Sequence, residues 1–196
     1  MIDRESYRNR TAVITGGARG FGKAFGTALA ERGAHVVLVD LDGAAVEATA
    51  AAIRAAGCGA TGLAGDAVDE ARMGEIMVYA ASLNGGIDIL INNAGLHSDE
   101  YSRPIADMGL SKTRRLFEVN VLGVIACTLA AKPHMVGRQG ASIVNISSSA
   151  AHMGGTAYGT SKLAVAGLTI TFARELGRDG IRVNAISPGA RFVTGE

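Results

Sequence analysis

The sequence predicts an α/β fold in which a parallel sheet lies between layers of helices. Its 196 residues are 48% hydrophobic and 19% charged, which is the balance of an ordinary globular protein. Short apolar, β-branched runs alternate with helical stretches, as they do in chains whose strands pair in parallel. The runs are apolar almost without interruption, as strands must be when helices cover both faces of the sheet. We therefore expect a doubly wound sheet in three layers, within one domain spanning residues 1–196.

The expected elements follow from these runs in chain order. Strands are expected at 11–16, 35–40, 87–92, 142–147 and 181–187, with a weaker strand at 61–66. The helical spacing of Phe21, Phe25 and Leu29 predicts a helix between the first two strands, and Gly33 ends it. The alanine-rich segment 43–57 predicts a second helix, which also ends in glycine.

The glycine-rich stretch "TGGARGFG", residues 15–22, lies between the first strand and the first helix. Free amides and the dipole at a helix N-terminus favour a pyrophosphate, and Gly16, Gly20 and Gly22 allow it to approach closely. Asp40 ends the second strand, 18 residues after Gly22, where a carboxylate accepts hydrogen bonds from an adenosine ribose. Turn, helix and acid together indicate a dinucleotide site rather than a purely structural turn.

Two charged residues give opposite indications about the cofactor. Arg19, beside the phosphate turn, would favour the 2′-phosphate of NADP. Asp40 would repel that phosphate, whereas Arg19 can point to solvent or to the pyrophosphate without penalty. We therefore expect NAD, with NADP as the weaker alternative.

Candidate catalytic side chains lie in "YGTSK". Tyr158 and Lys162 are four residues apart, so on a helix they share one face. A free tyrosine titrates near pH ~10, and an ammonium together with an oxidised nicotinamide would lower its pKa toward neutrality. An isolated pair of this kind would be ordinary surface residues. Here Ser147, Ser148 and Ser149 follow an apolar strand and therefore lie at the carboxyl edge of the sheet, where such sheets bind ligands.

With these residues in view, the chain resembles the short-chain dehydrogenase/reductase family from about Thr11 to Gly189. The matching motifs are "TGGARGFG", "NNAG" at 92–95, "FEVNVLG" around Asn120, "ISS" at 146–148, "YGTSK" and "NAISPG". The resemblance implies a Rossmann-type enzyme that moves hydride between a nicotinamide and an alcohol or carbonyl group.

The resemblance also implies roles for individual residues. Tyr158 resembles the general acid/base, and Lys162 resembles its pKa-lowering partner and a ligand of the nicotinamide ribose. Ser148 resembles the residue that orients the substrate oxygen, although the interval to Tyr158 is short and Ser147 is an alternative. Asn120 resembles the anchor of a proton-relay water.

The implied cofactor contacts extend along the chain. Asp66 with Ala67 resembles the pair that holds the adenine, and residues 93–95 resemble a cofactor contact, with a sheet-supporting turn as the alternative. The full set is Gly16, Arg19, Gly20, Phe21, Gly22, Asp40, Leu41, Asp66, Ala67, Asn93, Ala94, Gly95, Tyr158, Lys162, Pro188 and Gly189.

Composition and spacing argue against other classes. A net charge of +1 gives no field to attract nucleic acid or an anionic membrane. The first ten residues are polar and charged with no apolar run, so we expect a cytoplasmic protein. Cys58 and Cys127 read as reduced core residues, and the four histidines show no metal-binding spacing, so no metal is expected. His97 and His152 are interpreted as surface loop residues, with a pocket-lining role as the alternative.

The favoured function is an oxidoreductase for a secondary alcohol or ketone. The alternatives are an NADP-dependent ketone or 3-oxoacyl reductase, a non-catalytic dinucleotide-binding regulator, and a sugar-nucleotide epimerase, against which the absence of a larger substrate domain argues. The apolar helix expected at 159–177 favours a homo-oligomer, a dimer or tetramer. The substrate itself is not predicted.

The end of the chain departs from the family pattern. "RFVTGE" resembles a piece that family members carry beyond their substrate lid, and here it directly follows "SPGA". We expect lid residues to be missing after about residue 189, with a chain break between Pro188 and Phe192, and a last strand missing after Glu196. A true truncation, with Thr194 near the nicotinamide amide, is the alternative.

Overall fold

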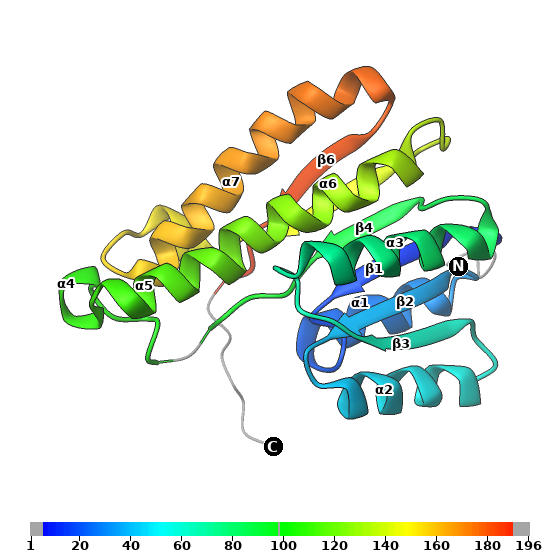
Figure 1. The fold of residues 1–196 in the computed structure, drawn as a ribbon, viewed down its shortest axis with the longest axis horizontal. Helices are drawn as coiled ribbons and strands as arrows, with labels where there is room; N and C mark the ends of the chain where they lie inside the picture. Colours follow the sequence, from blue (N-terminus) through cyan, green and yellow to red (C-terminus); the bar gives the residue numbers. More distant parts are fainter. Residues whose placement is uncertain (1–5, 98, 190–196) are drawn as a thin grey trace.

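The computed structural model describes residues 6–97 and 99–189, and a six-stranded parallel sheet forms its centre (Figure 1). The order across the sheet is β3-β2-β1-β4-β5-β6. The chain therefore moves outward from β1 to β3 and then returns to the other side of β1, which creates a switch point between β1 and β4. The strands are β1 Thr11–Thr15, β2 His35–Asp40, β3 Ala60–Ala64, β4 Ile89–Asn92, β5 Ser142–Ile146 and β6 Arg182–Ile186.

Helices cover the sheet in two layers, α1 and α2 on one face and α3, α6 and α7 on the other (Figure 1). The predicted Rossmann-type α/β/α class is thus confirmed. The α-helices are α1 Gly20–Ala30, α2 Gly43–Ala55, α3 Glu70–Asn84, α4 Ile105–Met108, α5 Leu110–Phe117, α6 Gly123–Met135 and α7 Ala157–Leu176. A π-helical turn, η1 Glu118–Leu122, joins α5 to α6, and two short 3-10 turns are η2 Ser149–His152 and η3 Gly177–Asp179.

Both faces of the central strands are buried, which accounts for their unbroken apolar character. In β1, Val13 packs into the core beneath α3 and α6, whereas Ala12 and Ile14 pack into the core beneath α1 and α2. All three have no exposed surface. Side chains alternate between the faces of a strand, so a strand with helices on both sides needs apolar residues at every position.

The predicted elements occur close to their expected positions. The weak strand at 61–66 is β3, and the segment 43–57 forms α2, which Asp42 caps by accepting a hydrogen bond from the Ala45 amide at 3.0 Å. The last helix begins earlier than the expected residue 159. Thr156 caps it by accepting from the Gly159 amide at 3.0 Å, which places Tyr158 in the first turn.

One helical run has the length and composition of a membrane span. It extends over Leu110–Met135 with a mean hydropathy of 1.4, and 44% of its apolar window is buried within the protein. Cys127, Ala131 and Met135 of α6 belong to the core under the sheet. Packing against that core accounts for the buried part of this run, whereas Leu122 and Leu129 within it are exposed. The break expected between Pro188 and Phe192 concerns residues 190–196, which lie outside the described residues.

Candidate active site

A groove of about 330 Å³ follows the carboxyl ends of the strands around the switch point. It brings together residues from five segments that are distant in sequence, as the predicted topology requires. Of the expected cofactor contacts, it is lined by Gly16, Arg19, Asp40, Leu41, Asp66, Ala67, Asn93, Ala94 and Gly95. Tyr158 and Lys162 come from α7, and Pro188 follows β6, where its carbonyl accepts a hydrogen bond from the Ser149 amide at 2.9 Å.

The three glycines of the turn are required for different reasons. Gly16 has φ +66°, and a Cβ there would lie 2.8 Å from Asn93 Nδ2. A Cβ on Gly22 would collide with the Gly16 carbonyl oxygen. Gly20 has φ +56°, but no atom lies within 4 Å of its Cβ position. The start of α1 is therefore closely packed beneath and open at Gly20, as a cradle for a phosphate must be.

Asn93, which directly follows the neighbouring strand β4, supports this turn. Its Nδ2 donates to the carbonyl oxygens of Thr15 and Gly16, both at 3.0 Å. The Thr15 hydroxyl accepts from the amides of Asn93 at 3.1 Å and Ala94 at 3.0 Å. The side chain of Asn93 is thus committed to the structure of the turn. Thr15, the last residue of β1, was not among the residues expected at the site.

Asp40 lines the groove and also holds the turn. Its Oδ2 accepts from the Ala18 amide at 3.1 Å, and its Oδ1 accepts from the Asp42 amide at 3.2 Å. A carboxylate oxygen has more than one acceptor direction, so ribose hydroxyls can still bind. Together with the open position at Gly20, this acceptor makes the residues present fit an adenosine dinucleotide.

Asp66 and Ala67, expected to hold the adenine, also line the groove. Asp66 Oδ1 accepts from the Val68 amide at 3.2 Å, and Oδ2 pairs with Arg115 at 3.4 Å. Arg115 also pairs with Glu118 at 3.0 Å, and the hydrogen bond with Glu118 is the main reason that the pKa of Arg115 is raised. These contacts fix the loop after β3 against the start of η1.

The two candidate serines have different environments. Ser147 is 2% exposed, and its hydroxyl donates to the Lys162 carbonyl at 2.9 Å. Ser148 is half-buried, accepts from the Ala150 amide at 3.2 Å and forms a side-chain hydrogen bond with Tyr158. Of the two, Ser148 is the serine whose hydroxyl faces the phenol.

Among the groups of the protein itself, Lys162 is not a cause of any lowering of the Tyr158 pKa. Burial raises the pKa of Tyr158 above its ordinary value, and the hydrogen bond with Ser148 opposes this. The Lys162 ammonium lies 5.8 Å from the Tyr158 ring centre and donates to the Ile146 carbonyl at 2.8 Å. Burial lowers the pKa of Lys162 to about 8. In the protein alone the phenol is desolvated and the ammonium is directed at a backbone carbonyl, so the lowering expected from Lys162 together with an oxidised nicotinamide stays a prediction.

Asn120 joins the two sides of the site. It has no exposed surface; its Oδ1 accepts from the Leu96 amide at 2.7 Å, and its Nδ2 donates to the Leu96 carbonyl at 3.2 Å. Nδ2 also donates to the Ser161 hydroxyl at 3.1 Å, and that hydroxyl donates to the Tyr158 carbonyl at 2.7 Å. The Asn120 side chain is thus a clamp between the loop after β4 and α7. Ser161 was also missed, although it lies within "YGTSK".

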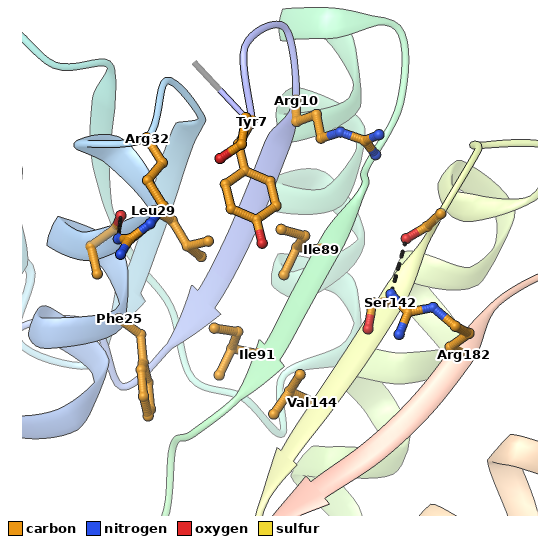
Figure 2. A pocket seen from close by; sticks show the side chains of 13 residues that line it. Tyr7, Arg10, Phe25, Leu29, Arg32, Ile89, Ile91, Ser142, Val144 and Arg182 are labelled. Carbon is orange, nitrogen blue, oxygen red and sulfur yellow. Dashed lines mark hydrogen bonds between the residues drawn. The ribbon is translucent and has the colours of Figure 1, made fainter. Parts of the chain in front are cut away.

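A larger hollow, of about 500 Å³, lies elsewhere (Figure 2). Figure 2 shows Ile89, Ile91 and Val144 on its floor, with Phe25 and Leu29 of α1 beside them. It lies on the face of the sheet that α1 covers. None of the candidate catalytic or cofactor-binding residues lines this hollow.

Fold and site together define a dinucleotide-dependent oxidoreductase. The sequence profile of the short chain dehydrogenase family matches residues 10–194, and the chain belongs to this family. It is 37% identical to a cis-4-hydroxycyclohexanecarboxylate dehydrogenase of Sinomonas cyclohexanicum, over 94% of this chain and 74% of the relative. It is 38% identical to a sorbitol dehydrogenase of Cereibacter sphaeroides, over 92% of this chain and 70% of the relative.

Among solved structures, the fold matches a protein of Haemophilus influenza described as a candidate D-mannonate oxidoreductase and determined with bound NAD. The TM-score is 0.89 at 28% identity, over 95% of this chain and 73% of that one. The chain is therefore an oxidoreductase of the short chain dehydrogenase family.

Proposed function

We propose that this protein transfers hydride between NAD(H) and a secondary alcohol or ketone. The observation that carries the proposal is the convergence of Tyr158, Ser148 and Lys162 at the carboxyl edge of the sheet, directly beside the dinucleotide groove. Two relatives whose names give alcohols as substrates support this class of reaction.

Each residue has a proposed task. Ser148 holds the substrate oxygen, and the Tyr158 hydroxyl exchanges the proton with that oxygen. When bound, the nicotinamide cofactor supplies the hydride chemistry and, in its oxidised form, a positive charge. Since burial raises the pKa of Tyr158, we infer that the lowering needed for proton transfer depends on this added charge.

Lys162 is proposed to bind the ribose next to the nicotinamide. A Cβ on Gly95 would lie 3.4 Å from Lys162 Nζ and 3.2 Å from Asn120 Oδ1. Gly95 borders the groove, so its lack of a side chain keeps a path open from the groove to the ammonium. We assign Asn120 to positioning, and a role in holding a relay water remains a prediction.

NAD is the proposed cofactor. Asp40 is a carboxylate at the position where an adenosine ribose would lie, and it would repel a 2′-phosphate. The matched structure with bound NAD agrees with this choice.

Three further proposals accompany this function. The chain acts as one domain and as a homo-oligomer, since apolar side chains remain exposed on α6 and α7. Its partners are small-molecule alcohols rather than nucleic acids or membranes. A cytoplasmic location agrees with the two free cysteines, Cys58 and Cys127.

The decisive experiment is Tyr158→Phe, assayed with a panel of secondary alcohols and both NAD and NADP. We expect kcat to fall at least ~1,000-fold while the Kd for NADH changes little, since the lost hydroxyl acts on the reacting oxygen. Thr160→Val, an exposed change in the same turn, is the control. Retained turnover with weakened NADH binding would contradict the proposal.

A further inference from the structure

His97 packs against the catalytic tyrosine. The His97 and Tyr158 rings meet edge to face, with centres 4.7 Å apart and planes inclined by 62°. His97 is exposed, whereas the preceding residue, Leu96, packs inward on the small cluster of Met108 and Ala157. The imidazole is therefore directed to the open side of the site, where a substrate must approach Tyr158.

Hydrogen bonds on both sides of His97 hold the contact between His97 and Tyr158. Asn120 binds both backbone groups of Leu96, which fixes the residue before His97, and reaches the α7 turn through Ser161. The loop is also tied to the start of α7, because the Tyr158 amide donates to the Tyr101 carbonyl at 3.2 Å. The position of the imidazole is thus set by the backbone.

The nitrogens of His97 are free to bind a ligand. Among residues 6–97 and 99–189, neither nitrogen has a hydrogen-bond partner, and the ring contact with Tyr158 is the interaction that the imidazole makes. An imidazole both donates and accepts hydrogen bonds. Apolar packing alone would be served equally well by phenylalanine at this position.

We infer that His97 determines substrate specificity by binding a second oxygen substituent, a hydroxyl or a carboxylate, near the reacting carbon. This inference rests on the proposed function, because the substrate oxygen must lie at Tyr158. Since the imidazole contacts the ring of the residue that holds the reacting oxygen, its nitrogens can reach only groups within a few bonds of that carbon.

The test uses three six-membered ring alcohols: cyclohexanol, 1,2-cyclohexanediol and 2-hydroxycyclohexanecarboxylate. His97→Phe keeps the ring on Tyr158 and removes the nitrogens. We expect kcat/KM to fall about 10-fold for the diol, the acid or both, mainly through KM, and to change less than about 2-fold for cyclohexanol. A fall for the diol indicates that His97 recognises a hydroxyl group, and a fall for the acid indicates that it recognises a carboxylate.

Two controls separate recognition from folding. His152→Phe changes another exposed histidine at this edge and should leave the substrate ratios unchanged, and His97→Gln should restore part of the loss for the oxygen-bearing substrates. An equal effect of His97→Phe on all three alcohols, or no effect on any, would overturn the inference.

Binding gives a readout that does not depend on turnover. Fluorescence of the NADH complex measures the Kd of each alcohol, and the diol or the acid should bind more tightly than cyclohexanol to the unmodified protein but not to His97→Phe. If no alcohol is oxidised, the proposed function fails while this comparison still decides the role of His97. Equal binding of all three to the unmodified protein would refute that role.

Discussion

Lys162 combines a charge with an almost completely buried position. The residue is 5% exposed, and its ammonium donates to the Ile146 carbonyl. Burial lowers its pKa from the ordinary 10.5 to about 8, so the charged form is less stable in the folded protein than in the unfolded chain. A group that costs stability in this way is a mark of a functional site.

The resulting pH dependence has a definite sign. Between pH 8 and 10.5 the unfolded chain binds more protons at Lys162 than the folded protein does, so the free energy of unfolding contributed by this residue rises with pH. Lys162→Met should therefore be about 2 kcal/mol more stable at pH 7, after loss of the Ile146 hydrogen bond. This advantage should disappear by about pH 10.5. Urea unfolding across this range measures the difference.

The matched control is Lys23→Met, which removes an exposed lysine of α1. The free energy of unfolding of Lys23→Met should differ from that of the unmodified protein by the same amount over this pH range. A constant difference for Lys162→Met would contradict the lowered pKa.

Asp40 should decide between the two nicotinamide cofactors. Asp40→Asn keeps one side-chain oxygen as an acceptor for the Ala18 amide and removes the negative charge. We expect the Kd ratio of NADP to NAD to fall at least ~10-fold, because the like-charge repulsion of the 2′-phosphate is lost. Titration with each cofactor measures the ratio, with Asp42→Asn as the neighbouring control. A preference of the unmodified protein for NADP would show that the proposed selection is wrong.

At the scale of elements, the site depends on a junction between the loop after β4, the π-helical turn η1 and α7. Asn120 provides this junction with three hydrogen bonds and no exposed surface. The chain of hydrogen bonds runs from Leu96 through Asn120 and Ser161 to the Tyr158 carbonyl. Buried networks of this kind hold elements in one arrangement because each unpaired group would carry a desolvation cost.

Removing the junction should loosen both elements together. Asn120→Ala should lower the free energy of unfolding by about 2–4 kcal/mol and reduce kcat more than NADH affinity, because buried partners lose their hydrogen bonds. Asn84→Ala, which removes a single bond to the Thr11 hydroxyl at 3.1 Å, should cost about 1 kcal/mol. Denaturant titration and steady-state kinetics give both quantities. Equal losses in the two variants would show that Asn120 is not a junction.

At the scale of the whole molecule, two apolar rows remain uncovered on the helices of one face. Leu122 and Leu129 lie seven residues apart on η1 and α6 and are 55% and 56% exposed. Leu163 and Ile170 lie seven apart on α7 and are 52% and 59% exposed. A spacing of seven places each pair on one side of a helix, as in helices that pack against a partner.

These rows are the proposed surface for self-association. The double substitution Leu129→Glu and Ile170→Glu should convert the oligomer to a monomer, because it would bury two charges in the contact. Light scattering during size-exclusion chromatography at micromolar concentration gives the mass. Val78→Glu, an equally exposed position on α3, should leave the mass unchanged. A monomeric unmodified protein would contradict the proposal.

Much of the fold could be predicted from local features of the sequence. Strand positions follow from apolar runs, and the start of α1 follows from a glycine turn whose residues each meet a steric demand. The candidate site was only partly predictable. The hydrogen bonds of the Thr15 hydroxyl and of the clamp formed by Asn120 and Ser161 join residues 24 to 79 positions apart, except for the last step within α7. No local pattern carries such pairings.

The sequence by itself determined the order of the elements, the glycine turn before α1, the carboxylate of Asp40 at the end of β2, and the placement of Tyr158 and Lys162 on one helix. These depend on residue type and short spacing, which set backbone conformation and helical periodicity. Only the tertiary structure decided which serine faces the phenol, the burial that raises the pKa of Tyr158, and the contact between His97 and Tyr158. Those properties depend on desolvation and on the approach of distant segments, which arise only when the helices pack on the sheet.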